Sequence, residues 1–205
     1  KVEHPSVSNA CRWLENHGFD VTYIDTDETA RVDIDRVRDA ITEKTSLLSI
    51  QLANNETGTL QPVKEILEIC RERGVLVHTD AVQAIGKIPV DVRDLDVDLL
   101  TLSAHKIYGP KGVGALYIKK DVVIDALIAG GGQEGGVRSG TENVLEIVGL
   151  GKAAEKGGQL LENMGHVKKL RDRLEKGIAA IVNDYKFNGN KKYRLPKTLN
   201  VTFPR

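Results

Sequence analysis

VDLLTLSAHKIYGPKGVGALYI, residues 97–118, contains two apolar runs separated by a lysine and a turn rich in glycine. The runs at 98–102 and 114–118 are almost continuously apolar, as strands covered on both faces are. Lys106 follows the first run after three intervening residues, although a lysine is costly to bury unless it is paired or takes part in chemistry. The stretch therefore predicts a buried sheet with a lysine at the end of one strand.

The same alternation extends toward the N-terminus. Apolar stripes bounded by proline, aspartate or glycine predict helices at 5–17, after Asp33 and after Pro62. Further strands are predicted at 19–24, 46–52 and 75–78. Strands that alternate with helices indicate right-handed βαβ units, so we expect an α/β fold: a mostly parallel sheet with helices on both faces.

The pattern changes after Asn143. One long helical stretch is predicted to about Val182, followed by a strand at 198–203. We expect residues 1–160 to form a large domain and residues 161–205 to begin a smaller C-terminal α+β domain. The chain starts without Met and stops inside an apolar strand, so we also expect it to be a piece of a longer protein.

Composition excludes several classes of protein. The 205 residues contain 29 Lys plus Arg and 29 Asp plus Glu, a balance that argues against nucleic-acid binding. No apolar run approaches the roughly 18 residues of a membrane helix. Cys11 and Cys70 lie far apart and form neither a disulfide framework nor a metal-binding spacing. We therefore expect a reducing, cytoplasmic setting and no metal site.

Polar residues follow three of the predicted strands. They are Asn54, Asn55 and Glu56, then Asp80 and Gln83, then Ser103, His105 and Lys106. Ligands of an open α/β sheet collect at the carboxyl ends of its strands. Pyridoxal phosphate (PLP) chemistry uses such a set, because it needs a lysine for a Schiff base, a carboxylate for the pyridine nitrogen and donors for the phosphate. The sequence therefore predicts a PLP site.

Several longer motifs resemble one enzyme family. HTDAVQAIGKIPVDV (78–92), DLLTLSAHKIYGPKGVGALY (98–117) and GGGQEGGVRSGTEN (130–143) resemble the cysteine desulfurases, fold-type I PLP enzymes of the class V aminotransferase group. VEHPSV (2–7) and ANNETG (53–58) match as well, in the same order. The resemblance covers nearly the whole chain and implies the large domain of a PLP-dependent transferase.

The resemblance also implies a role for each matching residue. Lys106 would hold PLP and act as the base and acid at the substrate Cα, with Asp80 against the pyridine nitrogen and Gln83 on the ring oxygen. The other implied contacts are Ser103 and His105 on the phosphate, His4 on the ring face with a part in proton transfer, Asn55 near the substrate carboxylate and ring oxygen, and Thr141 on the phosphate of a partner subunit. Each of these residues also has a plainer reading as a cap, turn or surface residue.

The family resemblance implies an activity and partners. A cysteine desulfurase converts L-cysteine to L-alanine and passes the sulfur, as an enzyme persulfide, to an iron–sulfur scaffold or another acceptor protein. We expect a homodimer, and we expect the nucleophilic cysteine to lie outside this chain, because neither Cys11 nor Cys70 stands in a matching motif.

Three alternatives remain open at this point. One is another class V PLP enzyme, such as a selenocysteine lyase or a transaminase. The second is a non-catalytic α/β scaffold that has lost its cofactor. The third is a nucleotide-binding module, which the glycine-rich stretches support poorly because they match neither standard phosphate-binding pattern.

Overall fold

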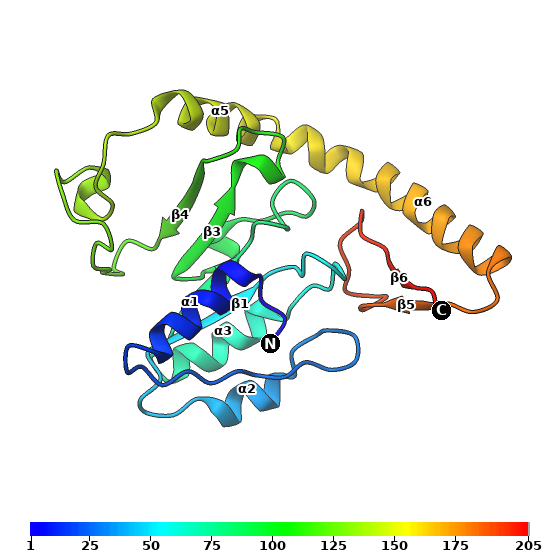
Figure 1. Cartoon of the computed structure of the whole chain (residues 1–205), viewed down its shortest axis with the longest axis horizontal. Coiled ribbons are helices and arrows are strands. Elements are labelled where there is room, and N and C mark those ends of the chain that lie inside the picture. The colour runs from blue at the N-terminus through cyan, green and yellow to red at the C-terminus, as the bar shows by residue number, and fades with distance from the viewer. Residues whose placement is uncertain (205) are drawn as a thin grey trace.

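A four-stranded sheet forms the centre of the computed structural model, which describes residues 1–204 (Figure 1). Its strands are β1 (Leu47–Gln51), β2 (Leu76–Asp80), β3 (Leu99–Ser103) and β4 (Gly114–Ile118), in the order β1-β2-β3-β4. The first three strands run parallel, and β4 pairs antiparallel with β3. The expected α/β fold with a mostly parallel sheet is confirmed.

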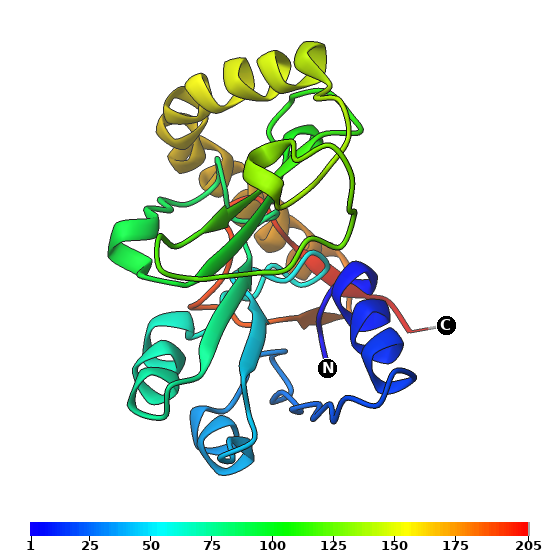
Figure 2. The same cartoon turned by 90° about the vertical axis from the view of Figure 1, so that its left-hand side faces the viewer.

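Helices cover both faces of this sheet. They are α1 (Pro5–Glu15), α2 (Ile34–Ala40), α3 (Val63–Glu72), α4 (Val92–Leu95), α5 (Val144–Glu155) and α6 (Gly157–Ile181), with 3-10 turns η1 (Ala104–Lys106) and η2 (Glu134–Gly136). Figure 2 shows α1 on one side of the strands and α2 and α3 on the other. Within residues 1–204, none of the helices combines the length and the hydropathy that crossing a membrane requires.

Local sequence explains where these helices begin. Pro5 stands in the first turn of α1, and the His4 ring accepts a hydrogen bond from the Ser6 main-chain nitrogen. Asp33 caps α2 in the same way through the nitrogen of Asp35. These bonds satisfy amides that a helix N-terminus otherwise leaves without a partner.

The core lies between α3 and the parallel strands. Ile66 and Cys70 of α3, Val77 of β2 and Leu100 of β3 are all at most 1% exposed. Full burial of such a branched apolar side chain stabilises the fold by about 1.5–3 kcal/mol. The packing fixes the strands in register, and so fixes which residues reach their carboxyl ends.

The C-terminal part packs onto the loop after β1. A two-stranded antiparallel sheet forms from β5 (Lys186–Asn188) and β6 (Asn200–Thr202), below α6 in Figure 1. The main-chain nitrogen of Leu195 donates to the Gly58 oxygen at 2.9 Å, and the nitrogen of Leu60 donates to the Tyr193 oxygen at 2.9 Å. A Cβ at Gly58 would stand 2.5 Å from Cβ of Thr198, so this approach requires glycine.

Three sequence-based expectations need correction. The predicted strand at 19–24 is wrong: this segment is irregular, and only an isolated bridge joins Thr26 to Val32. It pairs with none of the described strands, and an extended segment needs a neighbour for its main-chain groups. The single helix expected from Asn143 is two helices that meet at Lys156, and β5 was not predicted. The division into domains at residue 160 stays a prediction.

Candidate active site

Asp80 and Lys106 lie at the same edge of the sheet. Asp80 is the last residue of β2 and is in register with Thr101 of the parallel strand β3. β3 ends at Ser103, and η1 then carries Lys106. Because β2 and β3 are adjacent parallel strands, Asp80 and Lys106 both follow carboxyl ends at the same edge of the sheet.

The Asp80 carboxylate is held in one orientation. The residue is 9% exposed, and its Oδ1 accepts a hydrogen bond from the Val82 main-chain nitrogen at 2.9 Å. Within residues 1–204, Oδ2 has no hydrogen-bond partner. A buried carboxylate with one free oxygen is suited to bind a cationic N–H group.

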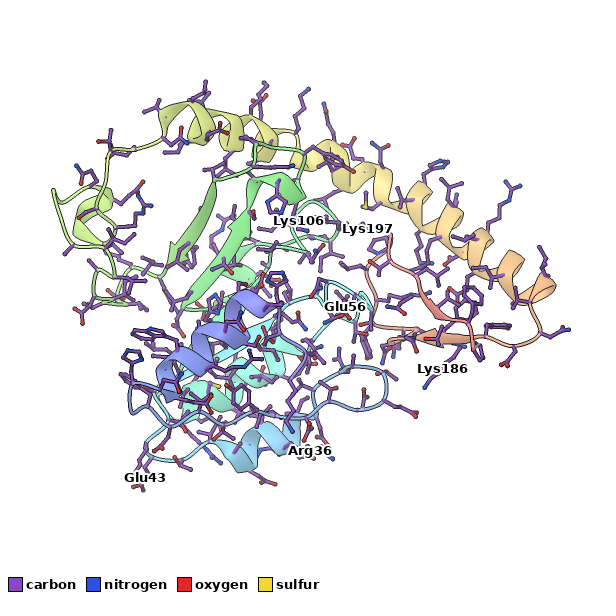
Figure 3. The ribbon with its side chains drawn as sticks, viewed as in Figure 1. Arg36, Glu43, Glu56, Lys106, Lys186 and Lys197 are labelled. Carbon is purple, nitrogen blue, oxygen red and sulfur yellow. The ribbon has the colours of Figure 1, made fainter. Side chains whose placement is uncertain are left out.

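Lys106 belongs to a group of three lysines. Its neighbours are Lys87, in the turn after β2, and Lys197, in the loop before β6; Figure 3 shows Lys106 and Lys197 close together. In the part of the chain that the structure describes, no carboxylate lies within 4 Å of any of the three amines. Burial lowers the pKa of Lys87 to about 8, with further contributions from Lys197 and Lys106. The group favours an anionic ligand.

Ser103 and His105 form a polar pair beside Lys106. Ser103 Oγ and His105 Nδ1 are 2.7 Å apart. Ser103 is half-buried at the end of β3, whereas His105 is exposed on η1. The pair offers a hydroxyl and the second ring nitrogen of the histidine to a ligand at this edge.

The segment before α1 is bound to the end of β1. Gln51 Nε2 and Asn54 Nδ2 both donate to the Val2 main-chain oxygen, at 2.7 and 3.0 Å. Both amides belong to buried residues. These two hydrogen bonds hold Val2 at the end of β1, and His4 follows two residues later. The Nδ1 atom of His4 accepts from Ser6, so in the neutral ring the proton lies on Nε2.

Glu3 adds a buried carboxyl group to the contacts between the N-terminal segment and the end of β1. The main-chain nitrogen of Gln51 donates to Glu3 Oε1 at 2.9 Å, while Oε2 is buried without a partner among residues 1–204. Burial raises the pKa of Glu3 to about 7; the Gln51 hydrogen bond opposes this change, and the nearby Asp80 charge adds to it. The carboxyl group thus titrates near neutrality.

The remaining predicted residues lie in loops. Gln83 is half-buried in the turn after β2, and Asn55 is exposed in the loop after β1, so both follow strands that end at this edge. Thr141 is exposed between η2 and α5. Among the described residues, none of these three side chains forms a hydrogen bond with another predicted site residue. Except for Thr141, the predicted residues thus follow strands that end at this edge or are bound to such a strand, and their roles stay predictions.

The two cysteines lie on helices, and the half-buried His78 lies on β2. Cys70 lies in the core, where burial raises the pKa of its thiol to about 11, and burial also raises the pKa of Cys11 in α1. His78 pairs with Ser49 Oγ at 2.8 Å between β2 and β1. No group of three potential metal ligands is found in the described part of the chain.

Four residues at this edge were not predicted to take part. They are Glu3, Gln51, Asn54 and Lys87. Asn54 stood among the polar residues at the strand ends and received no role. Lys87 carried a sequence signal, since it is a lone lysine within the apolar stretch AIGKIPV.

Comparison with known proteins places this geometry in context. Residues 1–205 match a family model described as aminotransferase class-V. The chain is 50% identical over 209 residues to a Clostridium botulinum protein named cysteine desulfurase IscS, covering 99% of this chain and 52% of the relative. A protein of the same name from Methanosarcina thermophila is 51% identical over 203 residues, covering 98% and 50%.

Solved structures give the same result. A NifS-like protein superposes with a TM-score of 0.94 at 43% identity, over 98% of this chain and 56% of that one. A structure described as SspA in complex with cysteine has a TM-score of 0.83 at 40% identity, over 99% and 56%. The chain therefore spans about half the length of the curated relatives that it matches.

Proposed function

The chain belongs to the aminotransferase class-V family, and from this membership we propose that the whole protein is a cysteine desulfurase that converts L-cysteine to L-alanine. Relatives named cysteine desulfurase IscS, which are 50% and 51% identical to this chain in sequence, support the proposal. The observation that carries it is the position of Asp80 and Lys106 at the carboxyl ends of adjacent parallel strands. A carboxylate and a lysine amine at one sheet edge are the minimum that the family cofactor requires.

The donor set fits PLP. Lys106 would bind its aldehyde carbon, Asp80 its pyridine nitrogen and Gln83 its ring oxygen. The remaining contacts would be Ser103 and His105 on the phosphate, His4 on the ring face, Asn55 near the ring oxygen and the substrate carboxylate, and Thr141 on the phosphate of a partner subunit. The amines of Lys106 and Lys197, with no carboxylate beside them in residues 1–204, suit the anionic phosphate. When bound, PLP supplies an electron sink for the substrate.

The residues of this chain then divide the work. Asp80, oriented by its hydrogen bond from the Val82 nitrogen, would place its carboxyl group against the pyridine nitrogen. The Lys106 amine removes the substrate Cα proton and returns it. His4 presents Nε2 to the same space, because Nδ1 is held by Ser6, and assists this proton transfer. Asn55 orients the substrate carboxylate through its amide.

Sulfur transfer needs a nucleophilic thiolate, which we place outside residues 1–205. The thiolate would attack the substrate sulfur, and the Cβ–sulfur bond would break with its electron pair passing to the three-carbon remainder. The attacking sulfur would then carry a persulfide, and the remainder would take up a proton at Cβ and leave as alanine. Burial disfavours the thiolate of Cys70, and its raised pKa makes it a poor nucleophile. We further propose a cytoplasmic homodimer that delivers the sulfur to an iron–sulfur scaffold or another acceptor protein.

Assay of the whole protein tests this function. With PLP, L-cysteine and an excess of dithiothreitol, which reduces the enzyme persulfide, alanine and sulfide should form in equal amounts, and Lys106→Ala should abolish both. Lys169→Ala, which removes an exposed lysine of α6, is the matched control. Turnover of selenocysteine or of another amino acid in place of cysteine would instead favour a different class V enzyme.

A further inference from the structure

Lys87 is a buried lysine that the proposed reaction does not use. It lies in the turn after β2 and is 6% exposed. Its Nζ donates to the main-chain oxygen of Lys106 at 2.7 Å. No carboxylate lies within 4 Å of it in the described chain, so this carbonyl is its one hydrogen-bond partner there. Burying an amine without an ion pair costs folding free energy, so the burial of Lys87 indicates that its contact with Lys106 has a role.

The Lys106 oxygen lies where the main chain leaves η1. The amides of Ile107 and Gly109 both donate to Ala104, each at 2.9 Å, and close the turn. Tyr108 then takes a left-handed conformation with φ of 65°. The turn that contains Lys87 packs against this bend: a Cβ on Gly86 would lie 3.2 Å from Cγ2 of Ile107. Lys87 thus reaches the bend from a neighbouring, closely packed segment.

We infer that Lys87 is a positioning residue for Lys106: its buried amine binds the Lys106 carbonyl and fixes the turn from which the Lys106 side chain projects. The inference rests on the proposed role of Lys106 but adds a residue to which the reaction itself assigns no part. Lys87 touches neither substrate nor cofactor in this scheme; it acts only through the main chain of Lys106.

The charge of Lys87 makes the contact depend on pH. The charged groups that face it are Lys106 on η1 and Lys197 in the loop before β6. Burial, aided by both cations, brings the pKa of Lys87 to about 8. A charged amine is the stronger donor to a carbonyl, so the contact weakens as pH rises above about 8.

Hydrogen exchange of the PLP-free whole protein tests the placement directly. Lys87→Met keeps the length of the side chain and removes the donor and the charge, whereas Lys87→Arg keeps both. Loss of the contact should raise the exchange rates of the Ile107 and Gly109 amides by about tenfold in Lys87→Met. Lys87→Arg should restore most of the protection. Lys197→Met removes a nearby cation that makes no hydrogen bond in the described chain, and should leave these amides unchanged.

Labelling of Lys106 supplies a second readout. PLP is added, the adduct is fixed with borohydride, and the rate of labelling at Lys106 is followed by peptide mass spectrometry. At pH 7 the wild type should be labelled about tenfold faster than Lys87→Met, and Lys87→Arg should be close to the wild type. The ratio of wild type to Lys87→Met should shrink above pH 8, where the wild type loses its charged donor.

The outcomes separate this inference from the proposed function. Wild-type exchange and labelling in Lys87→Met would overturn the inference and leave the function intact. An equal effect of Lys197→Met would also overturn it, since charge alone would then suffice. Raised exchange in Lys87→Met, together with a wild type that never takes up PLP, would support the positioning role and remove the enzyme assignment.

Discussion

The main-chain nitrogen of Gln51 donates to Glu3 Oε1 at 2.9 Å, which joins the end of β1 to a segment 48 residues earlier in the chain. The second oxygen of that carboxyl group is buried without a partner within residues 1–204. The neutral acid is therefore better accommodated than the carboxylate, as the pKa of about 7 indicates.

Glu3 should make stability fall as pH rises toward neutrality. Its folded pKa of about 7 lies above the ordinary value of 4.5, so its contribution is complete below 4.5 and is lost as pH rises to about 7. The loss amounts to about 3 kcal/mol at most. Glu3→Gln keeps an acceptor for Gln51 and should flatten the free energy of unfolding between these pH values, as measured by urea denaturation.

Glu43→Gln is the control for this experiment. Glu43 is an exposed residue just after α2, and Figure 3 shows it at the periphery of the molecule. The pH profile of this variant should match that of the wild type. An unchanged slope in Glu3→Gln would contradict the assignment.

Asp80→Asn should separate cofactor binding from turnover. The amide retains the size of the side chain but removes the charge opposite the pyridine nitrogen, so Lys106 should still be labelled by PLP and borohydride. We expect kcat with L-cysteine to fall by about 100-fold or more. Asp39→Asn, at an exposed position in α2, controls for the loss of a carboxylate. Near-normal kcat in Asp80→Asn would refute the role of this residue.

Gly58→Ala should destabilise the protein more than Gly18→Ala. Both glycines have positive φ, 74° and 86°, so alanine is strained at either position. Only at Gly58 would the new Cβ meet Thr198, at 2.5 Å; nothing lies within 4 Å at Gly18. Strain alone costs about 1–2 kcal/mol, and the overlap adds about 1–3 kcal/mol. Thermal unfolding of the two variants measures the difference, and equal losses would show that Thr198 moves aside freely.

Replacing both cysteines of this chain should leave sulfur transfer working. Cys70 is buried and Cys11 lies in α1, and burial raises the pKa of both thiols. With excess dithiothreitol as reductant, alanine and sulfide production by Cys11→Ser and Cys70→Ala should stay close to that of the wild type, normalised to bound PLP. Loss of sulfide with either change, in a protein that still binds PLP, would place the nucleophile within this chain.

Most of the sheet follows from local patterns in the sequence. The strands at 98–102 and 114–118 were predicted because both read as short apolar runs. β3 is a parallel strand with Leu99 and Leu100 buried, whereas β4 is antiparallel and largely exposed, so the expectation that 114–118 is covered on both faces is wrong. The segment at 19–24 has the same local character, yet forms no strand, because pairing depends on a partner that periodicity does not reveal. β5 escaped prediction for the related reason that its three residues are recognisable only through β6.

The site residues also differ in whether local sequence could predict them. Asp80, Ser103 and Lys106 were found because the carboxyl ends of parallel strands meet at one edge. Glu3 and Lys87 were missed because their partners are distant: 48 residues separate Glu3 from Gln51, and 19 separate Lys87 from Lys106. Contacts of this kind depend on the completed packing of the chain.

The loop that carries Asn55 is braced from behind by the C-terminal segment. Gly58 and Leu60 are hydrogen-bonded to Leu195 and Tyr193, and Thr59 Oγ1 accepts from the Asn190 nitrogen at 3.0 Å. Any displacement of the segment that joins β5 to β6 is therefore coupled, through these hydrogen bonds, to a displacement of the loop after β1. Motion of the C-terminal segment thereby changes the position of the Asn55 amide, which is proposed to orient the substrate.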